Sequence, residues 1–374
     1  MSRHFLRTAM TCLSQDDFLL RHRFSTFEAL LMVIYNLSHN ESLDQGWALL
    51  GMALNIGIAL RCNVDQNSNP IDTERRRRCW AGLLTLHTYQ GILFRDVDMS
   101  FLLNIKASLP TDVDDANITE DGISQTRNHQ GSTQMTMMRY KIRLFQLSVE
   151  ICRHISGPAR LNQDSLRSFD RAIAEEQQQW DLMYTIDGFP NILNSTSYAH
   201  WSVLQTYAHH LYLLIHQPFS HSKSLHFLPE SQKRCINSSI SLLFIHKQIF
   251  EAPLLRNYLW LLSGVTSLKA LHAAVALNSC IQDLASVSNS GHDLEAYKLE
   301  IEGLATRMKS LSDRSDICFR GCRMIAHLQA QAREKDISDG GLAGLSEETL
   351  EGWFDIRDWM DVDPSVWGIT WKML

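Results

Sequence analysis

Apolar residues at helical spacing constrain the fold of this chain more than any other feature. Phe27, Leu30 and Ile34 recur three or four residues apart, as on one face of an amphipathic helix. Similar stripes lie at Trp47, Leu50, Leu54 and Ile58; at Met138, Ile142, Phe145, Val149 and Cys152; at Leu166, Phe169, Ile173 and Trp180; and at Leu204, Ala208, Leu211 and Ile215. Further helical patterns cover 231–250, 254–288, 293–312 and 315–333. Apolar and polar residues show no sustained alternation, so we predict an all-α protein of about ten helices, packed as one large or two closely packed helical lobes.

Size and charge narrow the classes of function. The chain has 374 residues, of which 45% are hydrophobic, and this is enough for a large core or two packed lobes. Its formal net charge is −6 and its pI is about 6.2. A protein that mainly grips DNA is usually basic, because phosphate contacts use Lys and Arg. We therefore do not expect this chain to hold DNA by itself.

The cysteines and the chain start favour a soluble intracellular protein. Eight cysteines are scattered, mostly inside helical patterns, without the paired spacing of a structural zinc site. Arg3, His4 and Arg7 interrupt the start, and no apolar core of a signal peptide follows. No apolar run approaches the length that crosses a bilayer. We expect no metal ligands and no cofactor in this chain, and no membrane partner.

An enzyme is the remote alternative. Asp112, Asp114 and Asp115 could hold magnesium as the aspartates of all-α terpene synthases do, but they follow a proline in an apparent loop. No Asp or Glu stands four residues after Asp115, so a solvated or capping role is favoured. The sixteen histidines form no metalloprotease pattern, and the glycines form no phosphate loop or nucleophile elbow. We predict that the chain is not an enzyme and has no catalytic residues.

A run of four arginines, Arg75 to Arg78, follows Glu74 and precedes Trp80. A helix is expected to start near Asp72, and successive residues on it point about 100° apart. The four side chains therefore cannot face one DNA groove. We expect two of them to pair with carboxylates of neighbouring helices and two to be solvated. In the preceding helix Gly51, Ala53 and Gly57 are small, which would let a neighbouring helix approach closely.

This ordered set of motifs resembles the fungal-specific regulatory domain, or middle homology region, of zinc-cluster transcription factors. The resemblance is strongest over residues 25–290. The residues that match the family signature are Gly51, Ala53, Glu74, Arg76, Arg77, Arg78, Trp80, Leu109, Pro110, Asp112, Asp114, Asp115, His216 and Pro218. The resemblance implies a structural role for them, and Pro218 is expected to stop its helix at His216.

The resemblance implies a nuclear regulator of RNA polymerase II transcription, serving a biosynthetic or nutrient-use gene set. In this family DNA and zinc are bound by an N-terminal module with six cysteines, and this chain has no such segment. Expected partners are transcription machinery or a coactivator, and a homo- or heterodimer partner, with DNA reached only through the absent module. The alternative is a non-DNA-binding protein that dimerises with an intact regulator and restrains it.

Four segments are expected along the chain: an N-terminal segment (1–24), the regulatory domain (25–333), a Gly-rich linker (334–346) and an acidic, aromatic tail (347–374). Acidic residues interleaved with bulky apolar ones are typical of activation segments. The residues of this candidate activation segment are Trp353, Phe354, Asp355, Asp358, Trp359, Asp361, Asp363 and Trp367. The alternative is a terminal helix that packs its tryptophans onto the domain.

Overall fold

The computed structural model describes residues 2–39, 43–66, 69–93, 99–124, 131–156, 161–285 and 291–338. Within these ranges the chain forms eleven α-helices and four 3-10 helices, which confirms the all-α prediction. The α-helices are α1 (Ser2–Gln15), α2 (Phe24–His39), α3 (Leu43–Ala59), α4 (Pro70–Leu93), α5 (Thr136–Ser156), α6 (Gln163–Tyr184), α7 (Ser195–His216), α8 (Pro229–Glu251), α9 (Val265–Ala285), α10 (Gly291–Leu311) and α11 (Asp316–Ser338). The 3-10 helices are η1 (Ser100–Asn104), η2 (Asp115–Asn117), η3 (Gln217–Phe219) and η4 (Pro253–Ser263).

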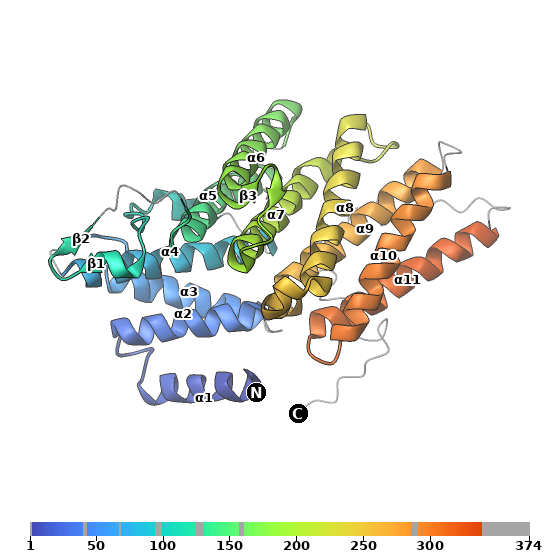
Figure 1. Ribbon diagram of the computed structural model, residues 1–374. Helices are drawn as coiled ribbons and strands as arrows, with labels where there is room; N and C mark the ends of the chain where they lie inside the picture. The colour runs from blue at the N-terminus through green and yellow to red at the C-terminus, as the bar shows by residue number, and fades with distance from the viewer. Residues whose placement is uncertain are drawn as a thin grey trace.

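The helices stack roughly in chain order, with α7 in the middle (Figure 1). Helix α7 contacts α5 and α6 from the first part of the chain and α8 and α9 from the second part. Most of its residues are buried. One large core is formed mainly by side chains of α1 to α7, and a second by α8 to α11 together with Leu213 of α7. The molecule is therefore two closely packed helical lobes that share α7.

Local sequence signals set several helix ends. Helix α6 begins at a reciprocal cap, in which the Asn162 side chain accepts from the Ser165 N–H and the Ser165 hydroxyl accepts from the Asn162 N–H. Asn194 caps α7 through the Ser197 N–H. Helix α4 begins at Pro70, close to the start expected near Asp72, because proline suits the first helical turn.

The predicted helix over 254–288 is wrong as a single element. Helix η4 ends at Ser263 and α9 begins at Val265, and the two axes meet at 83°. Gly264 between them has non-helical angles, φ −139° and ψ −128°. Apolar spacing continues through this break because both helices bury side chains, so the pattern alone does not mark the corner.

Two short hairpins interrupt the helices. Strands β1 (Ile118–Thr119) and β2 (Gly122–Ile123) pair antiparallel, as do β3 (Thr185–Ile186) and β4 (Phe189–Pro190). Asp187 and Gly188 join β3 to β4 with φ of 51° and 81°. Two consecutive left-handed residues make the tight turn that strand twist favours, and Asp-Gly is a common sequence for it.

The ends of the domain differ from the expected boundaries. Helix α1 lies in the predicted N-terminal segment, packs on α2 and contributes Leu13 to the first core. Helix α11 continues to Ser338, so 334–338 are helical although a linker was expected from 334. The sequence Ala-Arg-Glu-Lys at 332–335, which leads into this stretch, has high helix propensity. The expected activation segment lies outside the described residues.

Among the described residues, no single helix combines the length and apolar content that span a bilayer. Helices η4 and α9 together are long and apolar enough, but a bend separates them. Most residues of α9 are buried inside the protein.

Candidate functional site

The first two arginines of the run attach α4 to the helices that precede it. Arg75 donates to both carboxylate oxygens of Glu28 on α2, at 3.3 and 2.7 Å. These hydrogen bonds raise the Arg75 pKa above its ordinary value. Arg76 donates to the Leu60 carbonyl at 2.8 Å, just after α3 ends, and its guanidinium lies 4.8 Å from the Phe24 ring centroid. This contact satisfies a carbonyl that a helix end leaves unpaired.

The other two arginines bind acidic residues in the loop after α3, in η2 and on α4 itself. Arg77 forms two parallel hydrogen bonds of 2.8 Å with Asp65, which also accepts from Ser108 at 2.7 Å. The hydrogen bond from Arg77 lowers the Asp65 pKa. Arg78 donates to Glu74 at 3.2 Å and binds Asp115.

The expectation that two arginines would be solvated is therefore wrong. Three of the four pair with carboxylates and the fourth with a backbone carbonyl. The four side chains point about 100° apart around α4. Each still finds a partner, because neighbouring segments surround the helix. The run is a set of attachment points within the protein.

Glu74 is the buried centre of this network. Its side chain is 1% exposed and accepts from the Thr111 backbone N–H at 3.0 Å and the Thr111 hydroxyl at 3.1 Å. Arg78 supplies the positive partner that a buried carboxylate needs. Glu74 thus fixes the loop after Pro110 onto α4.

The aspartates after Pro110 attach the same loop to the start of α5. Asp112 accepts from the hydroxyls of Thr133 and Thr136, at 2.5 and 3.0 Å. Asp114 accepts from the Gln134 N–H at 2.8 Å. These hydrogen bonds hold the loop against the residues at and just before the start of α5.

Arg139 of α5 completes this attachment by donating to the Pro110 carbonyl at 2.8 Å. Pro110 is buried, whereas Leu109 is 48% exposed. The expected acidic cluster is therefore built into the fold. Among the described residues, no group of three or more His, Cys, Asp or Glu side chains is placed to hold a metal ion.

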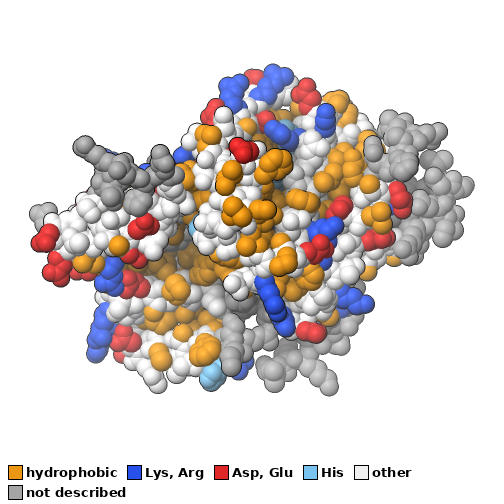
Figure 2. All heavy atoms as spheres, in the orientation of Figure 1, with side chains coloured by type: hydrophobic (Ala, Val, Ile, Leu, Met, Phe, Trp, Pro, Cys, Tyr) orange, Lys and Arg blue, Asp and Glu red, His pale blue; other side chains and the backbone are white. Residues whose placement is uncertain are grey.

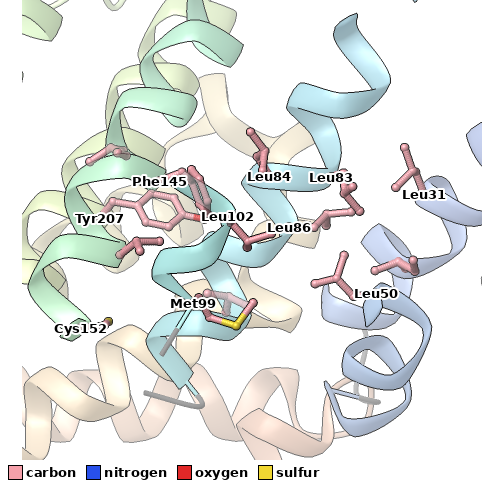
Figure 3. Close-up of a cluster of buried hydrophobic side chains, with 14 of the residues drawn as sticks. Leu31, Leu50, Leu83, Leu84, Leu86, Met99, Leu102, Phe145, Cys152 and Tyr207 are labelled. Atoms are coloured by element: carbon pink, nitrogen blue, oxygen red, sulfur yellow. The ribbon is translucent and has the colours of Figure 1, made fainter. Parts of the chain in front are cut away.

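Trp80 and Ala53 lie in the first core, part of which, with Leu50 and Leu83, is shown in Figure 3. Trp80 is 2% exposed, and a β-carbon at Gly57 would come 3.4 Å from its ring and 3.0 Å from Phe27. Gly57 thus allows the close approach expected of it. Gly51 does not: it is exposed and has nothing within 4 Å, because it lies on the opposite side of α3 from buried Ala53.

His216 and Pro218 join the two lobes. Helix α7 ends at His216, and Pro218 lies in η3 directly after it, as predicted. The His216 ring bonds the Ser231 hydroxyl of α8 at 3.0 Å and the Asp170 carboxylate of α6 at 2.9 Å. Arg234 of α8 binds the same carboxylate through two nitrogens, at 3.0 and 2.9 Å.

Ser231, His216 and Asp170 share the connectivity of a hydrolase triad, but their surroundings differ. Ser231 is 0% exposed, so its hydroxyl meets no substrate. Arg234 also forms an ion pair with the Asp170 carboxylate, which ties α8 to α6. The group is a structural joint of α6, α7 and α8. Asp170, Ser231 and Arg234 could not be recognised from the sequence, because up to 64 positions separate them and no local motif links them.

A comparison with known protein families identifies the kind of domain in which these contacts occur. The family "Fungal specific transcription factor domain" matches residues 2–186, from α1 to the end of β3. The chain belongs to this family. It is therefore a member of a fungal transcription regulator family.

The match covers about half of the chain and contains the whole arginine network. It begins at residue 2, so it includes α1, and it ends before His216 and Pro218. Neither curated proteins nor solved structures gave a match to the chain.

Proposed function

We propose that this chain is the regulatory domain of a nuclear regulator of RNA polymerase II transcription, and that it acts through contacts rather than chemistry. The family membership carries the proposal. The internal pairing of the arginine run supports it, because guanidinium groups bound to Glu28, Asp65 and Glu74 are not available to DNA phosphates. DNA contact would then come from a separate module, and the net charge of −6 agrees with that division.

In this proposal the tail, 347–374, recruits the transcription machinery. Its sequence interleaves acidic and aromatic residues, a composition typical of segments that a coactivator groove receives as a short helix. Exchange between a free tail and a tail bound to the helical body would make a two-state switch. Limited proteolysis tests this exchange: equal protection of the tail under inducing and non-inducing conditions would contradict it.

Promoter occupancy in the native host tests the proposal as a whole. The chain, tagged at its own locus, should be enriched at a set of promoters, and deletion of its gene should change the transcript levels of the same genes. Absence from all promoters, with the protein present in the nucleus, would contradict the proposal. A matched control is Lys233→Ala, an exposed position on α8, which should leave occupancy unchanged.

A second function, restraint of an intact regulator by dimerisation, is favoured by one observation. The β3–β4 hairpin and its flanks expose large apolar side chains within twelve positions: Leu182, Met183, Ile186, Phe189, Ile192 and Leu193. Figure 2 shows hydrophobic side chains gathered in this region of the surface. Such patches on soluble proteins mark interaction sites. Under this alternative, deletion of the gene would raise transcription of the regulator's targets.

A further inference from the structure

Helix α11 leaves one face uncovered at the edge of the second lobe. Among the described residues it packs mainly against α10 and α9, and it is the last helix of the stack (Figure 1). Its inner face buries Cys318 and Ile325, each 0% exposed. On the outer face Phe319 is 40% exposed, and Ala326 and Ala330 are exposed as well. These three positions are seven and eleven residues apart, so they form one apolar stripe along the helix.

The charge along this stripe is positive. Arg320 and Arg323 lie beside it, and the Arg323 guanidinium lies 5.7 Å from the Phe319 ring centroid. The helix has no Asp or Glu between Asp316 and Glu334. An exposed aromatic ring and small alanines between guanidinium groups suit a partner that carries both carboxylates and bulky apolar side chains.

The tail, 347–374, has this composition. It carries seven Asp or Glu side chains against only Arg357 and Lys372, and tryptophans are interleaved among them. The exposed β3–β4 hairpin is a poorer match for the tail, because no Lys or Arg occurs between Arg171 and Lys223. Charge complementarity therefore favours the outer face of α11 as the surface that receives the tail.

The tail also starts close enough to reach this face. Helix α11 ends at Ser338, and at about 1.5 Å per residue Arg323 lies about 22 Å back along the helix. Residues 339–346, which join α11 to the tail, can span about 26 Å when extended. A segment tethered by so short a linker has a high effective concentration at the helix, so weak contacts are enough for binding.

We propose that the tail binds the outer face of α11 in the same molecule. Its tryptophans cover Phe319 and the two alanines, and its carboxylates pair with Arg320 and Arg323. Binding hides the side chains that recruit the transcription machinery, so the bound tail is the inactive state. This regulatory consequence rests on the proposed function, whereas the contact itself does not.

Trypsin cleavage of the native full chain tests the contact, because Arg357 is the only Lys or Arg between Lys335 and Lys372. The initial rate at which the 1–357 product appears is compared with the rate of the same cleavage in a synthetic peptide of residues 347–374. We expect cleavage to be about tenfold slower in the full chain, the effect of about 1.4 kcal/mol of binding, because trypsin cuts only the released tail. Equal rates in chain and peptide would overturn the proposal.

Two pairs of substitutions locate the contact. Arg320→Gln with Arg323→Gln should remove most of the protection, and so should Asp355→Asn with Asp358→Asn, each measured against the peptide of its own sequence. All four together should have no larger effect than either pair, since both pairs break the same contact. The tail pair changes no residue of α1 to α11, so it decides the question even if the α11 pair unfolds the domain.

Arg167→Gln with Lys233→Gln is the matched control, because it removes two exposed positive charges from α6 and α8. This pair should keep the protection. An α11 pair that folds and keeps full protection, or a control pair that loses as much as the α11 pair, would overturn the proposal. The assay does not measure transcription, so a protected tail in a chain without transcriptional output would contradict the proposed function and support the contact.

Discussion

Glu74 shows how one buried side chain can determine the path of a loop. The carboxylate is enclosed by α4 and accepts two hydrogen bonds from Thr111, so the Leu-Pro segment lies in one position. The sequence placed Glu74 and Pro110 in one signature, but did not indicate that Glu74 binds Thr111, the residue after Pro110. That contact spans 37 positions, and the partners of Arg75 and Arg77 lie 47 and 12 positions away. Spacing within a helix says where a side chain points, and only the tertiary fold says what it meets.

Replacement of Glu74 by glutamine should destabilise the domain strongly. The substitution keeps the size of the side chain but removes its charge, so Arg78 loses a partner and Thr111 a charged acceptor. We expect a loss of about 2 kcal/mol in the free energy of unfolding, measured by urea denaturation. Asp72→Asn, two residues earlier and mostly exposed, should change it by less than about 0.5 kcal/mol. Equal effects of the two variants would contradict the account.

Asp170 should make stability depend on pH in the acid range. Burial acts to raise its carboxyl pKa, but the hydrogen bonds from His216 and Arg234 outweigh burial, and the pKa lies below the ordinary 3.8. A lowered folded-state pKa stabilises the fold above about pH 4, and this stabilisation disappears as the pH falls through the folded pKa. Asp170→Asn should therefore cost about 2 kcal/mol at pH 7 and progressively less below about pH 4. Chemical denaturation at a series of pH values checks this, and a pH-independent difference would contradict it.

Among the secondary-structure elements, the helical spacing of apolar residues predicted most of the helices, because each helix buries at least one face. It failed where apolar spacing continues through a corner, as at Gly264 between η4 and α9. It also missed the β3–β4 hairpin, whose strands are too short to show alternation, although the Asp187-Gly188 turn was visible in the sequence. Small residues in α3 were correctly noticed, but only the fold tells which of them faces a neighbour.

Two glycines of α3 should respond to substitution in opposite directions. Gly51→Ala should raise the free energy of unfolding by up to about 1 kcal/mol, because the position is open and alanine favours the helix. Gly57→Val should lower it by about 2 kcal/mol, because Phe27 and Trp80 leave no room for the side chain. Thermal or urea unfolding measures both. Destabilisation by Gly51→Ala, or tolerance of Gly57→Val, would show that the packing of α3 is different.

For the whole molecule, the sequence predicted the fold class and the family, and the match over residues 2–186 confirms the family. It could not predict that the signature residues form an internal network, since the carboxylates that complete it belong to other segments.

The exposed β3–β4 hairpin should mediate association. At micromolar concentration the purified chain should sediment as a dimer, and Leu193→Glu should shift it toward monomer, because a charge in an apolar interface is costly. Leu225→Glu is the matched control: this leucine is 100% exposed and lies away from the hairpin sequence. A monomeric wild type, or identical behaviour of the two variants, would contradict the dimer contact.

The central claim is that this chain supplies regulatory output once another module brings it to DNA. The most direct test fuses the full chain to a heterologous DNA-binding domain upstream of a reporter gene and measures reporter transcription. We predict a change in transcription, which Trp353→Ala combined with Trp359→Ala weakens and Gly51→Ala leaves intact. A fusion that is folded, nuclear and bound at the reporter but leaves its transcription unchanged would contradict the claim.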